Sequence, residues 1–424
     1  MSTTATVGAE AHLPSDIKII DCDAHWTEPA DLWTSRVPRS LQSKVPVQRT
    51  VDGRTAWYIN GELWSGTGGN TIDRERRKVR GTSSVQPFEE IHPSASVVAD
   101  RLELMDDSGL FAQVLYPNGI GFASNHIFAI DDLEQRQMVL QVYNDHLVEV
   151  QSESDGRLFP QAMLPVWNMD LTVREMTRLI DKGIRGFTLS GCPELLGLPE
   201  LPEPYYEPMW DVFNETGAAA NFHIAAGMSR AAMEASWKRT AGPAPEVEPR
   251  PPDGEGPEVP AVLAPSWRSF SSRRSMAVSS TQGYISNARI IANLCNSDLF
   301  DRFPKLRIAS AESGIGWVPF ILEAMDFHYD EYGLADEPGF SGLRPSDHFR
   351  EHIHVMFWFE SATALSWLNE LGVSNVMVET DIPHPTCLYP DARQHFTTML
   401  AGTPEALARQ VLQENAADLY RIDT

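Results

Sequence analysis

Six side chains of metal-binding type lie near the ends of predicted strands. They are Asp23, His25, His223, Glu312, Asp381 and His384. Asp23 and His25 are two positions apart, so in an extended chain their side chains share one face. Imidazole nitrogens and carboxylate oxygens are the ligands that Zn²⁺, Mn²⁺ and Fe²⁺ take in proteins. If the fold gathers these residues, they offer the chemistry of a divalent metal centre.

Each of these residues alone has a structural explanation. A single His at a strand end is more often hydrogen-bonded in the core, and an Asp after a strand is more often a helix cap or a turn former. Six of them at one place would be a costly cluster of buried carboxylates unless a cation balanced the charge. The set as a whole therefore favours metal binding.

Eight short apolar segments, rich in Val, Ile and Phe, have lengths that suit buried parallel strands. They lie at residues 17–23, 112–117, 159–166, 184–191, 218–224, 306–313, 353–360 and 375–381. Helix-like segments separate most of them, and several of these end at a Gly that can cap a helix. The pattern predicts an α/β protein, a (β/α)8 TIM barrel with active-site groups at the C-terminal strand ends. A doubly wound sheet is the alternative, but no Gly-rich fingerprint follows the first strand.

The predicted domain organisation is an N-terminal tail, residues 1–16, followed by one barrel over residues 17–424 with two long loop insertions. The first insertion covers about residues 26–97 and the second about residues 227–280. Residues 242–260, within the second, are too rich in Pro, Gly and Glu to pack. We expect this part to be a flexible loop on the barrel rim.

The charge of the chain restricts its partners. Lys and Arg total 34 against 58 acidic residues, a net charge of −24, which disfavours nucleic acid and anionic membranes. One basic cluster in the first insertion is either a solvated face or a means of gathering an anionic substrate. It comprises Arg74, Arg76, Arg77, Lys78 and Arg80. The expected partner is a small-molecule substrate.

Composition also favours a cytoplasmic protein. No segment approaches the roughly 18 consecutive apolar residues of a membrane span, and the four Cys form no C-x-x-C pair. Such Cys usage predicts reduced thiols rather than a disulfide framework or a zinc ribbon. Apolar and aromatic side chains on the insertions predict a homo- or hetero-oligomer.

Four sequence motifs, taken in order, resemble a known family. They are IIDCDAHWTEPADLW, RLELMDDSGLFAQVLYP, FPKLRIASAESGIGWVP and VMVETDIPHP. They are similar to the amidohydrolase-related family of metal-dependent barrels, in the branch of aminocarboxymuconate-semialdehyde decarboxylase and the hydroxybenzoate decarboxylases. The similarity extends from about residue 17 to residue 420.

The resemblance implies a divalent metal, usually Zn or Mn. Its ligands, carried over by position, are Asp23 and His25 on strand one, His223 on strand five and Asp381 on strand eight. Asp23 stands where the family usually has His or Glu. Because a carboxylate oxygen suits Mn, Fe or Zn, the ligand set survives this change and the metal identity stays open.

Strand six departs further from the family pattern, because Glu312 stands where the family usually has a His that transfers a proton. Burial and the nearby charge of Asp381 would raise the pKa of Glu312 and suit it to act as an acid or base. Alternatively, Glu312 and His384 complete a second metal site, with two ions roughly 3.5–4 Å apart. The resemblance then leans toward family members that activate dioxygen at a dinuclear iron or iron-manganese centre.

Three functions follow from these alternatives. The first is a metal-dependent lyase (decarboxylase) or hydrolase acting on a small carboxylate-bearing organic substrate, with Glu312, His384 and Asp381 as catalytic residues. The second is a dinuclear oxygenase on the same barrel. The third is a catalytically silent subunit of a hetero-oligomer, which the intact ligand set disfavours. We expect the first.

Other residues have weaker signals. Glu28 could reach the metal or only end the strand, and His126 could contact substrate or lie on the surface. Trp358 and Phe359 follow strand seven, where they could form the wall of an organic substrate site or belong to the core.

Overall fold

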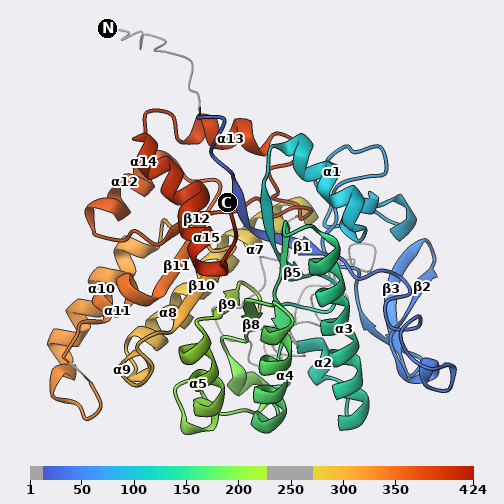
Figure 1. Cartoon of the computed structure of the whole chain (residues 1–424), viewed down its shortest axis with the longest axis horizontal. Helices are drawn as coiled ribbons and strands as arrows, with labels where there is room; N and C mark the ends of the chain where they lie inside the picture. Colours follow the sequence, from blue (N-terminus) through green and yellow to red (C-terminus); the bar gives the residue numbers. More distant parts are fainter. Residues whose placement is uncertain (1–12, 124, 227–270, 341) are drawn as a thin grey trace, which may run out of the picture.

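The computed structural model describes residues 13–123, 125–226, 271–340 and 342–424. Each predicted strand segment contains a strand, and together these strands form the centre of the molecule (Figure 1). They are β1 (Ile20–Trp26), β5 (Ala112–Pro117), β6 (Leu158–Pro160) with β7 (Ala162–Met163), β8 (Gly186–Thr188), β9 (Ala219–His223), β10 (Arg307–Ala311), β11 (Ile353–Phe357) and β12 (Val376–Val378).

The strands are parallel and follow one another in chain order. Hydrogen-bonded ladders join β1, β5 and β6 in one sheet and β7 to β12 in another. Gln161 alone separates β6 from β7 along the chain. A single bridge links Ala24 of β1 to Ile382 in the loop after β12. The order of a (β/α)8 barrel is therefore confirmed, although no ladder runs continuously around the described strands.

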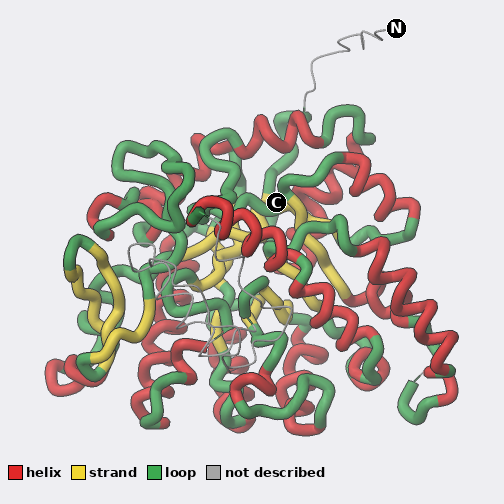
Figure 2. The backbone as a smooth tube through the Cα atoms, turned by 180° about the vertical axis from the view of Figure 1, so that it is seen from behind, coloured by secondary structure: helices red, strands yellow, loops and turns green. Residues whose placement is uncertain are grey.

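Helices cover the outside of the strands (Figure 2). The larger ones are α1 (Val98–Ser108), α3 (Leu133–Glu153), α4 (Met169–Asp181), α5 (Glu207–Thr216), α7 (Ser272–Tyr284), α8 (Ser286–Cys295), α10 (Val318–Tyr332), α11 (Pro345–His352), α12 (Ala362–Glu370), α13 (Ala392–Met399) and α15 (Asn415–Tyr420). Short helices are α2 (Asn125–Phe128), α9 (Leu299–Arg302) and α14 (Glu405–Arg409). Helices α1, α5 and α10 end at Gly109, Gly217 and Gly333 in the left-handed conformation, as the Gly positions predict.

The first insertion is more than a loop. It contains an antiparallel sheet of β2 (Val47–Val51), β3 (Arg54–Ile59) and β4 (Glu62–Ser65), at the edge of the molecule in Figure 1. The rings of Trp33 and Trp57 are fully buried and meet edge to face, 4.9 Å between centroids. These two rings therefore fill the core of their own chain.

The basic cluster of this insertion is largely paired within the chain. Its partners are Glu103 and Asp107 for Arg76, Asp73 and Glu75 for Arg77, and the carbonyl oxygens of Glu89 and Cys387 for Arg74 and Lys78. Since these cations already have local partners, the structure favours the interpretation of the cluster as a solvated face.

Much of the second insertion, including the predicted loop at 242–260, lies outside the described residues, as do residues 1–12 of the tail. The last turn of α7 packs on the end of β9, because a Cβ at Gly283 would be in van der Waals contact with Cδ1 of Ile224, 3.5 Å away. All four cysteines are free. Within the described ranges, no helix has the length and apolar character needed to cross a membrane.

Candidate metal centre

The structure brings all six predicted metal-binding residues together at the C-terminal ends of the strands. They form two overlapping groups, and within each group one ligand atom per residue lies within 4.8 Å of the others. The His223 group is Asp23, His25, His223 and Glu312, and the His384 group is His25, Glu312, Asp381 and His384. All six side chains are buried. They converge because parallel barrel strands end at the same face.

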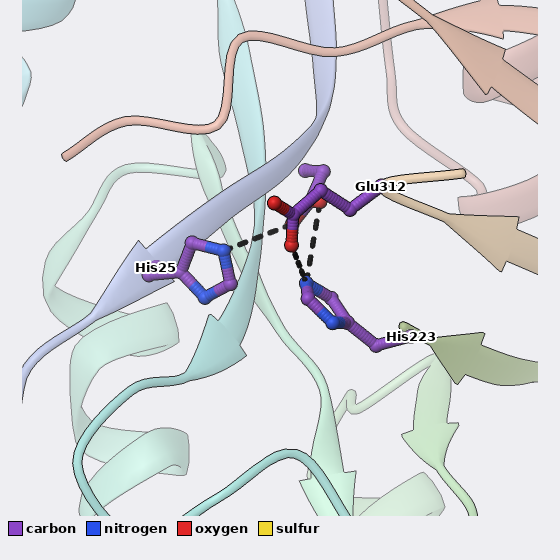
Figure 3. Close-up of side chains that lie close together, drawn as sticks. His25, His223 and Glu312 are labelled. Carbon is purple, nitrogen blue, oxygen red and sulfur yellow. Dashed lines mark ion pairs between the residues drawn. The ribbon is translucent and has the colours of Figure 1, made fainter. Parts of the chain in front are cut away.

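Two imidazole rings face the carboxylates directly. Nε2 of His25 lies 3.5 Å from Oδ1 of Asp23 and 3.2 Å from Oδ1 of Asp381. Nε2 of His223 lies 3.4 Å from Oδ2 of Asp23 and 3.3 Å from Oε2 of Glu312. Figure 3 shows His25, His223 and Glu312 pointing toward one another from β1, β9 and the end of β10. Nitrogen and oxygen ligand atoms of different strands thus surround one point.

Several of these atoms have no hydrogen-bond partner among the described residues. They are both carboxylate oxygens of Asp23, Nε2 of His25, Nε2 of His223 and Oδ1 of Asp381. A buried polar atom without a partner costs about 1–3 kcal/mol, and more if it is charged. A divalent cation would use these lone pairs, so the donor set fits a metal ion.

The pKa values of the same groups show the effect of burial without a balancing cation. Burial, with the charges of Asp381 and Asp21, raises the pKa of Asp23 well above its ordinary value. Burial lowers the pKa of His223 to about 4, so this ring is neutral at pH 7 and free to bind a metal. Burial and the neighbouring His384 hold the pKa of His25 well below its ordinary value. A bound cation would reverse the effect on the carboxyl groups.

Asp381 behaves differently from Asp23. Burial alone would raise the pKa of Asp381, but His384 and His25 together hold it below its ordinary value. Its Oδ2 also accepts a hydrogen bond from the hydroxyl of Thr386. Asp381 is therefore the carboxylate of the centre that ionises most easily.

Backbone carbonyls fix the orientation of two His rings. Nδ1 of His25 donates to the carbonyl oxygen of Pro117 at 3.3 Å, and Nδ1 of His223 donates to that of Ile224 at 2.7 Å. Each ring then presents the lone pair of Nε2 to the centre. Metal-binding His residues commonly have such a partner on the other nitrogen.

His384 has the opposite orientation. Its Nε2 lies 3.2 Å from Oδ1 of Asn118, while Nδ2 of Asn118 donates to the carbonyl oxygen of Gly69. Since Oδ1 of Asn118 is an acceptor, Nε2 of His384 is the donor and Nδ1 faces the centre, 2.9 Å from Oδ1 of Asp381. The ring also stacks on His25, with centroids 3.5 Å apart.

Two acidic residues of the centre have a left-handed backbone. φ is +53° at Glu312 and +58° at Asp381, a conformation that costs an L-residue roughly 1–2 kcal/mol. Hydrogen bonds hold both: N of Glu312 donates to Oε2 of Glu379 at 3.0 Å, and N of Asp381 donates to the carbonyl oxygen of Asp23 at 2.8 Å. This strain at both carboxylates fits a functional site.

Glu379 was missed by the sequence analysis. It is fully buried, and burial together with the Asp23 charge raises its pKa well above the ordinary value. Its position two residues before Asp381, inside the last apolar segment, is the one signal that could have singled it out.

The first insertion reaches the metal centre, which the sequence analysis also missed. A Cβ at Gly69 would stand 2.6 Å from Cδ2 of His384, so only a Gly allows this close approach. The hydroxyl of Thr71 donates to the carbonyl oxygens of Pro383 and His384, each at 3.0 Å. The insertion therefore supports the loop that carries His384.

Glu28 and His126 belong to neither group. The buried carboxylate of Glu28 accepts from the backbone N–H groups of Gly119 at 2.9 Å and Ile120 at 3.4 Å. Glu28 thus holds the loop after β5 instead of reaching the metal position. His126 is partly buried, and its carbonyl oxygen accepts from the indole of Trp64.

Aromatic rings border the centre. Tyr284, the last residue of α7, meets Trp358 edge to face at 5.2 Å and stacks on Phe359 at 5.3 Å. Trp358 is core, whereas Phe359 is 52 % exposed and remains available to an organic substrate. Phe122 stacks on His223 with centroids 3.9 Å apart.

The chain belongs to the amidohydrolase family, whose model matches residues 20–422. The predicted family resemblance is confirmed, and the protein is an enzyme of this family. No curated protein matches the chain.

Solved structures of similar fold include decarboxylases. An amidohydrolase of Mycobacterium avium subsp. paratuberculosis K-10 has a TM-score of 0.66 and 18 % identity, over 96 % of this chain and 99 % of that one. The 5-carboxyvanillate decarboxylase of Sphingomonas paucimobilis has a TM-score of 0.62 and 20 % identity, over 96 % of this chain and 100 % of that one. The dihydroxybenzoic acid decarboxylase of Polaromonas sp. JS666 was solved with manganese and the inhibitor 2-nitroresorcinol. It has a TM-score of 0.59 and 17 % identity, over 96 % of this chain and 98 % of that one.

Proposed function

We propose that the chain is a metal-dependent lyase, a decarboxylase of a small carboxylate-bearing organic substrate, with hydrolysis at the same centre as the alternative. One observation carries the proposal: buried nitrogen and oxygen ligand atoms converge at the barrel mouth without hydrogen-bond partners among the described residues. The decarboxylases among the structural neighbours support it, one of them solved with manganese.

In this proposal Asp23, His25, His223 and Asp381 hold a divalent ion, Mn²⁺ or Zn²⁺. When bound, the ion supplies a Lewis acid that polarises oxygen atoms of the substrate. The four residues come from the ends of β1 and β9 and the loop after β12, so the barrel sets their spacing.

Glu312 is the proposed proton donor. Burial and the charges of Asp381 and Asp23 raise its pKa well above the ordinary value, which favours the protonated acid that a donor must be. In decarboxylation the bond between the carboxylate and its carbon breaks, CO₂ leaves, and that carbon takes a proton from Oε of Glu312. His384 is the second candidate for this transfer, because its Nδ1 faces the same site beside Asp381.

A dinuclear oxygenase is the second candidate function. The observation that favours it is that His25 and Glu312 belong to both ligand groups. Glu312 would then be a ligand shared by two ions rather than a proton donor. The two functions differ in metal content and in their need for dioxygen.

The test is an assay of chelator-treated protein before and after loading with Mn²⁺. The substrates are a panel of hydroxylated aromatic and aliphatic carboxylic acids, and CO₂ release, hydrolysis and oxygen consumption are measured. We expect CO₂ release that requires Mn²⁺ and is lost in His223→Ala. Oxygen consumption without CO₂ release would support the oxygenase, and the absence of all three activities in the loaded chain would support the silent subunit.

His354→Ala is a matched control for this assay. His354 is also a buried His on a barrel strand, β11, but it belongs to neither ligand group. We expect this variant to retain its metal and its activity.

A further inference from the structure

A chain of four hydrogen-bonded polar side chains links α1, β5, β1 and the segment after β12 next to the metal centre, and each is fully buried. They are Arg101 of α1, Gln113 of β5, Asp21 of β1 and Thr380 after β12. Nη1 of Arg101 donates to Oε1 of Gln113 at 3.1 Å, and Nε2 of Gln113 donates to Oδ2 of Asp21 at 2.7 Å. The hydroxyl of Thr380 donates to the same Oδ2 at 2.5 Å. None of the four belongs to either ligand group.

This chain contacts the backbone of β1 at the ligand positions. Nη2 of Arg101 donates to the carbonyl oxygen of His25 at 2.8 Å. Oδ1 of Asp21 accepts from N of Asp23 at 3.3 Å and from N of Thr380 at 2.7 Å. Since Thr380 directly precedes Asp381, the chain acts on both sides of the centre.

The two sides need such a connection because β1 and β12 share no ladder in the described sheets. A single bridge joins Ala24 of β1 to Ile382, which lies in the loop after β12. Two backbone hydrogen bonds cross the same seam, from N of His25 to the carbonyl oxygen of Ile382 and from N of Asp381 to that of Asp23. The separation of the β1 ligands from Asp381 therefore depends on few contacts, and the bonds from Thr380 to Asp21 are among them.

Stability alone is a poor explanation for these residues. Taking a guanidinium and a carboxylate out of water costs several kcal/mol, and apolar side chains of similar volume often serve a core as well or better. A fully hydrogen-bonded buried network instead fixes one geometry. At this seam, that geometry is the relative position of the ligands.

We propose that Arg101, Gln113, Asp21 and Thr380 form a positioning network that holds Asp23 and His25 at the correct distance from Asp381 for metal binding. The inference rests on the proposed metal centre and deepens it. The four residues do not touch the ion. They act through the backbone of the residues that do.

Thr380 offers a sharp test because two substitutions separate its hydroxyl from its shape. Thr380→Val keeps the shape and removes the hydroxyl, whereas Thr380→Ser keeps the hydroxyl. For both variants and the wild type, Mn²⁺ affinity is measured by titration of chelator-treated protein, and Tm is measured without metal. We expect Thr380→Val to weaken Mn²⁺ binding about 10–100-fold, the usual effect of losing an outer partner of a metal site. Thr380→Ser should bind nearly as tightly as the wild type.

A purely structural role would lower the Tm of Thr380→Val and leave its Mn²⁺ affinity equal to that of Thr380→Ser, and this result would overturn the inference. Gln113→Leu breaks the chain on its other side and should also weaken Mn²⁺ binding, which provides a second test if Thr380→Val folds poorly. If the wild-type chain itself bound no Mn²⁺, the proposed metal centre would fail, a result distinct from the failure of the network alone.

Discussion

The His223 group and the His384 group share His25 and Glu312, yet their other members differ in how far hydrogen bonds satisfy them. In the His223 group, neither carboxylate oxygen of Asp23 has a hydrogen-bond partner in the described chain, and neither does Nε2 of His223. In the His384 group, Oδ2 of Asp381 accepts from Thr386, and only Oδ1, 2.9 Å from Nδ1 of His384, has no hydrogen-bond partner in the described chain. The His223 group therefore needs a cation, whereas the His384 group is partly satisfied without one.

This difference indicates which residues of the centre form the primary ion site. The unpartnered atoms of the centre belong to Asp23, His25, His223 and Asp381, three of which also lie in the His223 group, so an ion held by these four residues should bind first. Glu312 and His384 then have one of two roles. They either bind a second ion or stay free to transfer protons. The following predictions test this order.

The largest effect is expected from the ligands themselves. His223→Ala and Asp381→Asn should each lose bound metal while the fold persists, with Mn²⁺ affinity falling more than the roughly 10–100-fold expected for an outer partner. Metal content and far-UV circular dichroism check this. Unchanged metal content in both variants would show that the ligand assignment is wrong, and His354→Ala should keep its metal.

The next effect concerns pH and the stability of the metal-free chain. The pKa values of Asp23, Glu312 and Glu379 are raised in the folded state, so their contribution to stability is complete at low pH and is lost as pH rises through those values. The pKa values of His25 and His223 are lowered, so their contribution is complete above pH of about 6.5. Above that pH, the carboxyl groups therefore dominate among these residues.

Urea unfolding of the chelated chain between pH 6.5 and 8.5 measures this effect. The free energy of unfolding should fall by about 1.4 kcal/mol per pH unit for each carboxyl group that still holds its proton in the folded chain, because the unfolded chain has already released it. Saturating Mn²⁺ should reduce the slope, because the ion keeps its carboxylate ligands ionised in the folded state. Equal slopes with and without Mn²⁺ would show that these carboxyl groups do not bind the ion.

The smallest effect is expected where the first insertion meets His384. Gly69→Ala places a Cβ 2.6 Å from Cδ2 of His384 and should displace the ring. If His384 is a ligand, the crowding should weaken metal binding by about 1 kcal/mol, roughly fivefold. If His384 only transfers protons, affinity should stay the same and the catalytic rate should fall.

Gly316→Ala is the matched control for this substitution. A Cβ at Gly316 meets no described atom within 4 Å. This variant should therefore change neither the metal affinity nor the rate.

The strand ends and their ligands could be predicted from sequence because both signals are local. A barrel strand buried on both faces is a short apolar run, and the metal-binding residues stand at its end or shortly after it. His223 is the last residue of β9, and Asp381 lies in the loop after β12. The expected spacing of Asp23 and His25 also depends on neighbouring positions only. Such features remain visible in one sequence.

The supporting contacts could not be predicted in the same way, because they join distant positions. His384 and Asn118, which orients its ring, are 266 residues apart in the chain. The antiparallel sheet of the first insertion was predictable, however. Asp52-Gly53 and Asn60-Gly61 are turn pairs between alternating apolar residues, and all four have positive φ as tight hairpin turns require.

The most direct test of the metal centre is the metal content per chain of protein purified without added chelator, measured by inductively coupled plasma mass spectrometry. If the centre is that of the lyase, we expect about one divalent ion per chain, Mn or Zn. Close to two ions per chain, iron among them, would favour the dinuclear oxygenase. A chain that contains no metal and takes up no Mn²⁺, Zn²⁺ or Fe²⁺ on titration would show that these six residues do not form a metal centre.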